Sequence, residues 1–291
     1  MLTDQRNPDP PFPRWVVQPF IRALEQHEEL HRLLHLSMQG IATLRGVPGA
    51  VEVLAKLKPE DGLNLGKRLA GAKKQADFAE TEVDRGFPTL HAQTLLSLWA
   101  IVERLIRELL AVIIENDPDA LEIEAIRKLR VRVGELLAYE GYERAYFLVG
   151  LLDREVSGPL RHGINRFEDV LASFALSDAV EEDMSRTFFE MQQLRNLHAH
   201  RLGYADRTFV DRCPWLDPAE DGYVQVTHEM LETYFEAVAW YTLEIMCRVG
   251  QRYGWTREEF EAFLVDGRPT PGPAVDGDGD VTTSGGERNG G

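Results

Sequence analysis

Residues 90–115 read LHAQTLLSLWAIVERLIRELLAVIIE, and this stretch decides the fold class. Its apolar residues recur at intervals of three and four, which is the spacing of one face of an α-helix. That face is very wide and comprises Leu95, Leu98, Trp99, Val102, Leu105, Ile106, Leu109 and Ile113. No alternating strand pattern of useful length occurs elsewhere in the sequence. The sequence therefore predicts an all-α fold.

Further helices are expected on both sides of this stretch. Before it, helical spacing covers 15–44, 50–57 and 61–80. After it, we expect helices at 118–139, 142–154, 165–174, 179–202 and 227–253, the last with Thr227 as its N-cap. Residues 204–224 are expected to form a loop that is long for a compact domain, and long loops are often functional.

Four parts of the chain are expected from composition and helical patterning. The prolines of residues 1–14 predict a flexible arm. The Gly-, Pro- and Asp-rich residues 266–291 predict a disordered tail, because such a composition buries too little apolar area. Between them we expect an N-terminal helical extension at 15–89 and a helical domain at 90–265.

The formal net charge of −16 argues against a broad surface for nucleic acid, which would need an excess of Lys and Arg. Charge is nevertheless segregated, because short basic stretches occur at 127–132 and 195–212. No signal peptide or membrane-spanning run is recognisable, and Cys213 and Cys247 are expected to be reduced thiols. We therefore expect a cytoplasmic protein that does not contact a membrane.

Several common site motifs can be set aside. The Gly-rich phosphate loop, the Gly-x-Ser-x-Gly elbow and the His-Glu-x-x-His helix do not occur in the sequence. Asp276, Asp278 and Asp280 superficially suggest an EF-hand loop. Val281 occupies the position where that loop needs glycine, so calcium binding is not expected.

The stretch that carries chemistry is 192–201, which reads QQLRNLHAHR. On a helix, Arg195 falls within an apolar stripe formed by Met184, Phe188, Met191, Leu194 and Leu202. An arginine keeps its charge there, so it must be paired or serve a buried anion. Asn196 and His200 share a different face. The three can therefore meet one target only if the helix end unwinds or a second subunit contributes.

These residue types suit the cleavage of RNA. A histidine that titrates near neutrality can take the proton from the ribose 2′-OH as it attacks phosphorus. A fixed guanidinium stabilises the additional negative charge of the phosphorane, and an amide such as Asn196 orients a phosphate oxygen or the histidine. Such a transesterification needs no metal and gives a 2′,3′-cyclic phosphate.

Arg195, Asn196 and His200 match the R-φ-x-x-x-H signature of the HEPN superfamily, where φ is polar and most often Asn. The context is also similar, since the motif ends a penultimate long helix that follows a long apolar helix and precedes an amphipathic closing helix. The resemblance covers about 90–253 and leaves the helices before residue 90 unexplained. It implies a HEPN-like helical bundle.

The resemblance also implies a function and partners. Many HEPN proteins are metal-independent endoribonucleases in toxin, anti-phage or RNA-processing systems, and they generally dimerise so that two motifs line one cleft. Other members are inactive and bind RNA, nucleotide or protein. We therefore expect an RNA-cleaving homodimer without cofactor or metal, which a protein inhibitor or effector can also bind. The alternatives left open are an inactive binding module and a helical scaffold.

Further residues are candidates for supporting the site or contacting RNA: Glu103, His198, Arg201, Arg127, Lys128 and Arg130. In the purely structural alternative, Arg195 pairs with a core acid such as Glu103 and His200 caps the end of its helix. His198 is favoured as a packed histidine. A zinc site of His198, His200 and Cys213 is disfavoured, because histidines two apart on a helix point in nearly opposite directions.

Overall fold

The computed structural model describes residues 13–57, 65–156 and 162–259. Within these ranges every regular element is helical, apart from an isolated β-bridge between Tyr204 and Tyr223. The predicted all-α fold is thus confirmed for this part of the chain. Residues 1–12 of the predicted arm, the predicted tail and the EF-hand-like run lie outside the described residues. A search of the described helices for a membrane-spanning segment found none.

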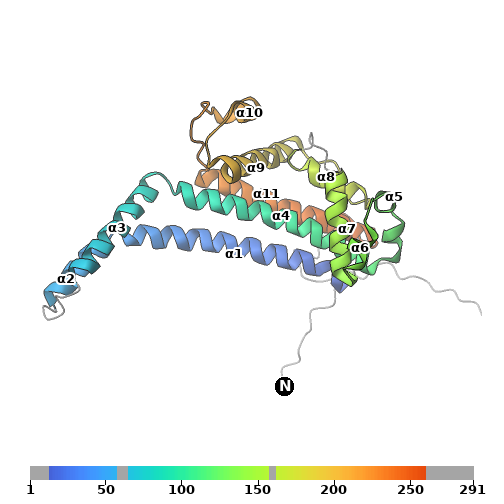
Figure 1. The fold of residues 1–291 in the computed structure, drawn as a ribbon, viewed down its shortest axis with the longest axis horizontal. Helices are drawn as coiled ribbons and strands as arrows, with labels where there is room; N and C mark the ends of the chain where they lie inside the picture. Colours follow the sequence, from blue (N-terminus) through green and yellow to red (C-terminus); the bar gives the residue numbers. More distant parts are fainter. Residues whose placement is uncertain (1–12, 58–64, 157–161, 260–291) are drawn as a thin grey trace, which may run out of the picture.

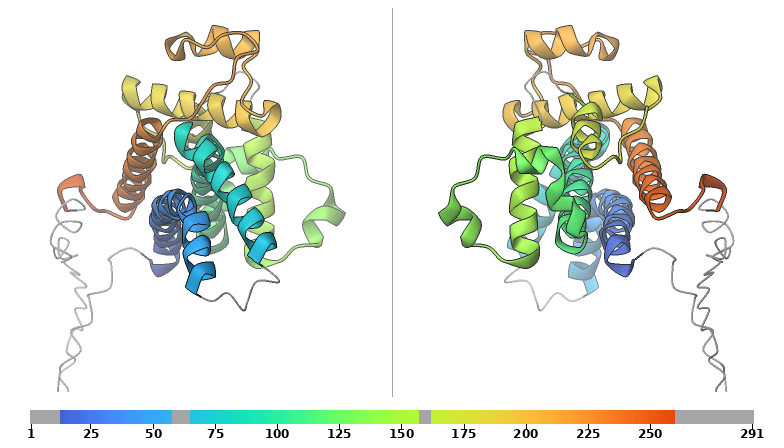
Figure 2. Two further views of the ribbon diagram at one scale, coloured as in Figure 1. Left: turned by 90° about the vertical axis from the view of Figure 1, so that its left-hand side faces the viewer. Right: turned by 90° about the vertical axis from the view of Figure 1, so that its right-hand side faces the viewer.

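The central element is α4 (Pro88–Asn116), which confirms the helix predicted at 90–115. Pro88 occupies its first turn, where the absent N–H costs no helical hydrogen bond. Buried residues occur around most of its circumference, including Leu95, Leu98, Trp99, Leu105, Leu109 and Ile113. The helices α1, α7, α9 and α11 pack against it from different sides, so α4 forms the axis of the bundle (Figures 1 and 2).

The N-terminal helices divide into a packed part and a projecting part. In α1 (Arg14–Leu44), Val16, Phe20 and Leu34 are buried in the same core as α4. In contrast, α2 (Val47–Leu57) buries no residue, and it extends with α3 (Leu65–Asp84) beyond the end of the bundle (Figure 1). The first predicted helix is therefore confirmed and shares the main core. The proposed domain boundary near residue 90 stays a prediction.

The prediction of one continuous helix at 118–139 is wrong. This stretch instead forms three short segments: η2 (Pro118–Glu122), α5 (Glu124–Arg127) and α6 (Val133–Leu137). Ile126 is buried, whereas Leu121, Val133 and Leu137 are exposed. The apolar residues of the stretch therefore do not form one continuous face that could hold a single helix against the core.

The second half of the bundle follows the predicted order. It contains α7 (Gly141–Val156), α8 (Asn165–Ala172), α9 (Glu182–Arg201) and α11 (His228–Arg252), close to the predicted ranges. Thr227 caps α11 as predicted, since its side chain accepts a hydrogen bond from the N–H of Met230. The expected loop at 204–224 contains α10 (Arg207–Arg212) and η3 (Pro214–Leu216). This segment rises above α9 (Figure 1).

A buried polar network ties α8 to α11. The Glu168 carboxylate accepts hydrogen bonds from the Tyr241 hydroxyl at 2.7 Å and from Arg248 Nη1 at 2.8 Å. It also accepts one from the backbone N–H of Asp178 at 3.0 Å. Burial, followed by the Glu168 charge, raises the pKa of Tyr241 well above its usual value. Arg248 is only 6% exposed, and its charge is compensated mainly by Glu168, with Glu244 Oε1 at the longer distance of 3.5 Å from its Nε.

We predict that Glu168→Ala lowers the free energy of unfolding by about 3–5 kcal/mol, because it leaves the buried Arg248 charge without its main partner. Urea denaturation followed by circular dichroism measures the effect. Glu236→Ala, which removes an exposed carboxylate from α11, is the control and should change stability by less than about 0.5 kcal/mol. Equal stability of the two variants would contradict the assigned role of the network.

Candidate functional site

The motif lies on the last turns of α9, and the helix remains regular through it. Phe188, Met191 and Leu194 are fully buried against the core and fix the rotation of α9 about its axis. The helix ends at Arg201, and Leu202 adopts a left-handed conformation with its N–H bonded to the Leu197 carbonyl. The helix end therefore does not unwind around His200. The unwinding that was considered as one way to bring the motif residues together is therefore not observed.

The structure brings Arg195 and Asn196 into contact. Arg195 is half-buried, and its Nη1 donates a hydrogen bond to Asn196 Oδ1 at 3.0 Å. Arg195 thus lies at the edge of the buried face rather than within it. His200 is exposed on the last turn. The Arg195–Asn196 hydrogen bond orients the guanidinium towards the face that carries His200.

Asn196 and His200 line a groove between α9 and α10. The other lining residues are Gln193, Leu197, Arg201, Asp206, Thr208, Phe209 and Arg212. The wall formed by α10 is well anchored, because Asp206 caps this helix by accepting the Phe209 N–H at 2.8 Å and Phe209 is buried. Two of the three predicted motif residues therefore face one groove, and Arg195 lies outside its lining but is hydrogen-bonded to Asn196.

Two arginines at this site bind neutral amides rather than carboxylates. Arg212 Nη1 donates to Gln193 Oε1 at 3.3 Å, as Arg195 does to Asn196. No acid among the described residues lies within ion-pair distance of either arginine. Arg201, in contrast, pairs with Asp206 at 3.2 Å. The groove therefore keeps positive charge that is not neutralised locally, in a protein whose formal net charge is −16.

His198 is a packed residue rather than part of the groove. Its ring meets Tyr223 edge-on with centroids 5.9 Å apart, and the residue is buried. Burial lowers the pKa of His198, and a backbone hydrogen bond with Val224 partly opposes this effect. The histidine therefore stays neutral at physiological pH. Its environment agrees with the packed role that the sequence favoured for it.

The other predicted support residues lie apart from the groove. Glu103 pairs with Arg166 at 3.3 Å, and within the described chain it makes no ion pair with Arg195. Arg127 and Lys128 are exposed and pair with Glu122 at 3.6 Å and with Glu124 at 2.5 Å. Arg130 is exposed in the same stretch, near α5 and away from α10 (Figure 1). Of the site residues predicted from the sequence, the groove is therefore lined by Asn196, His200 and Arg201.

Sequence reasoning missed the residues that α10 contributes, above all Arg212 and Phe209. The available signal was Asp206, a good N-cap residue at the start of a short segment with an apolar Phe209. The disfavoured zinc alternative gains no support, because His198, His200 and Cys213 form no metal-binding group in the described part of the chain. Burial also raises the pKa of the Cys213 thiol to about 12, which disfavours a thiolate. Searches of protein-family models, curated proteins and solved structures found no match to this chain.

The turn that follows α9 depends on Gly203. Its φ is +89°, and a Cβ at this position would lie 2.5 Å from Tyr223 Cε2 and 2.8 Å from His198 Cε1. Such contacts are too short, so the turn and the packed rings cannot accept a side chain there. Gly203 thus allows the chain to reverse direction and place α10 above α9.

We predict that Gly203→Ala lowers the free energy of unfolding by roughly 2 kcal/mol or more, because it combines backbone strain with a steric clash. Chemical denaturation measures the loss. Gly150→Ala is the matched control, because Gly150 lies within α7 with open space around it, and should stabilise the protein by up to about 1 kcal/mol. A Gly203→Ala protein as stable as the wild type would show that the turn tolerates a side chain.

Proposed function

We propose that this protein is an endoribonuclease that cleaves RNA without a catalytic metal ion, with His200, Arg195 and Asn196 as its catalytic residues. The observation that carries the proposal is the groove between α9 and α10. Its lining includes Asn196 and His200, and Arg195 and Arg212 at the site are held by amide oxygens. Guanidinium groups without a carboxylate partner are suited to bind phosphate.

Each residue has a defined role in the proposed reaction. His200 takes the proton from a ribose 2′-OH, whose oxygen forms a bond to the adjacent phosphorus. The guanidinium of Arg195 stabilises the negative charge that develops on the non-bridging oxygens, and Asn196 holds that guanidinium. The bond from phosphorus to the 5′ oxygen breaks, that oxygen takes a proton from solvent water and leaves as a hydroxyl, and His200 returns its proton to solvent. The products are a 2′,3′-cyclic phosphate and a 5′-OH end.

The exposure of His200, the proposed general base, supports the proposal. His200 is accessible on the last turn of α9, whereas His198 on the same turn is packed against Tyr223. An extended, single-stranded RNA could reach His200 without displacing the core. The resemblance of the motif to that of HEPN proteins points to the same reaction, and a role in a toxin or anti-phage system belongs to that resemblance.

We predict that the purified protein cleaves single-stranded RNA in the presence of EDTA. His200→Ala should lower the rate by about 100-fold or more, because it removes the general base. Arg195→Ala should lower it by about 100–1000-fold, because it removes a donor to the developing charge. Gel analysis of end-labelled RNA measures the rates, and periodate-resistant 3′ ends identify the cyclic phosphate.

The control for this experiment is His162→Ala. His162 contacts Phe189 and does not line the groove, so cleavage by this variant should equal that of the wild type. Circular dichroism establishes that each variant is folded. Equal activity of the wild type and His200→Ala would exclude the proposed base. RNA binding that Arg212→Ala weakens, without any cleavage, would instead establish the inactive binding module.

The site of one chain is incomplete, and we propose that a second copy completes it. Arg195 does not line the groove of its own chain, whereas large apolar side chains lie exposed beside it, including Leu202 at 79% and Tyr204 at 52%. Exposed apolar groups of this size are typical of an interface. A homodimer formed through the ends of α9 can bring the Arg195 of one chain to the groove of the other.

We predict that light scattering after size exclusion gives the mass of a dimer. Leu202→Glu should shift the protein towards the monomer and reduce cleavage, because it places a charge in the apolar interface. Leu121→Glu, which alters an exposed leucine on η2, is the matched control and should leave the mass unchanged. A monomeric wild type with full activity would overturn the dimeric site.

A further inference from the structure

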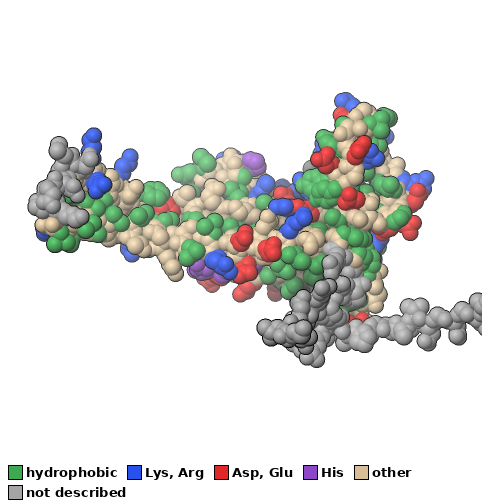
Figure 3. Space-filling view, turned by 90° about the horizontal axis from the view of Figure 1, so that it is seen from below, with side chains coloured by type: hydrophobic (Ala, Val, Ile, Leu, Met, Phe, Trp, Pro, Cys, Tyr) green, Lys and Arg blue, Asp and Glu red, His purple; other side chains and the backbone are tan. Residues whose placement is uncertain are grey.

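Five of the eight histidines gather where α1, α4 and α11 meet. They are His27, His31, His35, His91 and His228. The first three follow one another at intervals of four on α1, so their side chains lie along one face of that helix. Figure 3 shows histidine side chains at the edge of one face of the molecule, beside acidic and basic side chains. The groove between α9 and α10 contains none of these residues.

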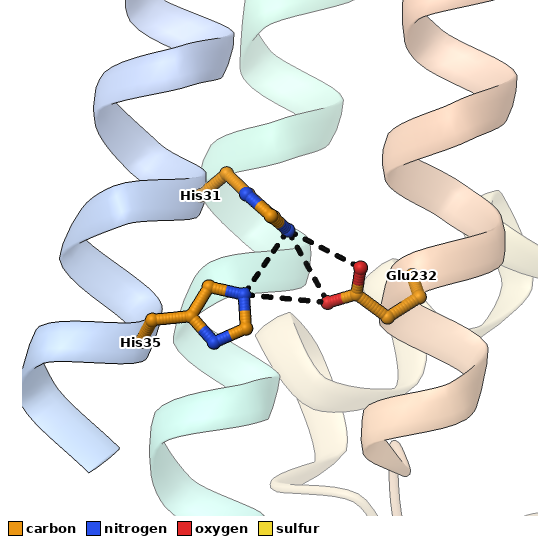
Figure 4. Close-up of side chains that lie close together, drawn as sticks. All are labelled: His31, His35 and Glu232. Carbon is orange, nitrogen blue, oxygen red and sulfur yellow. Dashed lines mark hydrogen bonds and ion pairs between the residues drawn. The ribbon is translucent and has the colours of Figure 1, made fainter. Parts of the chain in front are cut away.

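Within this cluster, His31, His35 and Glu232 direct their polar atoms at one another (Figure 4). His31 Nε2 lies 3.2 Å from His35 Nε2 and 3.3 Å from Glu232 Oε1. His35 Nε2 lies 3.8 Å from Glu232 Oε1. Glu232 comes from α11, 201 residues after His31, so the fold and not the local sequence creates the group.

These distances are those of ligands around one tetrahedral metal ion. Bonds of about 2.0–2.1 Å from Zn²⁺ to nitrogen or carboxylate oxygen separate neighbouring ligand atoms by about 3.3 Å. The His31–His35 separation and the separation of His31 from Glu232 Oε1 agree with this value to within about 0.1 Å, and the separation of His35 from the same oxygen is about 0.5 Å longer. No other group of His, Cys, Asp and Glu in the described residues meets the geometry.

Hydrogen bonding alone satisfies this group poorly. His31 Nε2 faces both the Nε2 of His35 and the carboxylate of Glu232, yet one ring nitrogen carries at most one hydrogen. A single cation bonded to the two imidazole lone pairs and the carboxylate satisfies all three at once. Two imidazoles and one carboxylate are a donor set for Zn²⁺ and related transition metals, whereas Mg²⁺ and Ca²⁺ prefer oxygen ligands alone.

The surroundings allow an ion to enter and help to hold its ligands. The side chains of His31, His35 and Glu232 are 38%, 43% and 40% exposed, so solvent reaches the group. His228 Nε2 lies 3.7 Å from Glu232 Oε1 and helps to position the carboxylate. The nearby Arg32 pairs with Glu28, which compensates its charge.

From this geometry we infer that His31, His35 and Glu232 bind a divalent transition-metal ion such as Zn²⁺, with water as the fourth ligand. The ion links α1 to α11 and thereby joins two helices from opposite ends of the chain. The helix α1, which carries two of the three ligands, lies on the far side of the bundle from α10 (Figure 2), and the site shares no residue with the proposed nuclease groove. It is therefore independent of the proposed RNA cleavage, and it adds a metal to a protein for which the sequence indicated none.

The test uses the untagged, full-length protein, freed of metal with EDTA and dialysed. Titration with Co²⁺ should give the intense visible absorption of a tetrahedral complex, saturating at one ion per chain, and Zn²⁺ should displace it. His31→Gln and His35→Gln should each weaken Zn²⁺ binding at least tenfold. Glu232→Gln, which keeps the shape of the side chain but removes its charge, should weaken it by a similar factor.

His162→Ala, which removes a histidine outside the cluster, is the control and should bind Co²⁺ and Zn²⁺ as the wild type does. A weak, octahedral Co²⁺ spectrum in the wild type would overturn the inference without recourse to any variant. Binding of fewer than one Zn²⁺ per chain at micromolar concentrations would also overturn it, as would unchanged affinity in His31→Gln and His35→Gln. RNA cleavage in EDTA is measured separately, so failure of one proposal leaves the other standing.

Discussion

The burial of α4 is the constraint on which the rest of the structure depends. A helix with apolar side chains around most of its circumference cannot face water, and each fully buried Leu or Ile stabilises the fold by about 1.5–3 kcal/mol. Four helices cover α4 from different sides, and each is rotated so that its own apolar stripe faces inward. For α9 this means that Phe188, Met191 and Leu194 point towards the core. The polar residues of its last turns are thereby directed outward, where α10 lies over them.

This outward face combines two arginines whose hydrogen-bond partners are neutral amides. In a chain with an excess of acidic residues, Arg195 and Arg212 are held by the amide oxygens of Asn196 and Gln193. A neutral partner orients a guanidinium without neutralising its charge, so its attraction for an anion is retained. Arg201 differs, because its pair with Asp206 ties the end of α9 to the start of α10. Arg201 thus helps to build the groove and Arg212 gives it charge, while Arg195 lies beside it, bonded to the lining residue Asn196.

The sequence was sufficient to predict the elements that depend on a long periodic pattern. The helices α4 and α11 have many apolar residues in register, and Thr227 marks the start of α11. The prediction of a single helix at 118–139 was wrong, because the apolar residues Leu121, Val133 and Leu137 remain exposed. The helix α10 was also missed, because a six-residue helix is too short to show a period and the surrounding prolines indicate a loop. The groove could not be predicted without α10, although its motif residues could.

The proposed metal-binding cluster also could not be predicted from the sequence alone. The sequence contains His27, His31 and His35 at helical spacing, but no site was predicted from them, and a repeat on one helix does not by itself define one. The third ligand, Glu232, is brought to it only because α1 and α11 both pack on α4 and so lie next to each other. Two residues further along α11, the Tyr234 hydroxyl donates a hydrogen bond to Glu190 on α9. The helix that supplies Glu232 is therefore also hydrogen-bonded to the helix that carries the motif, although the two proposed sites share no residue.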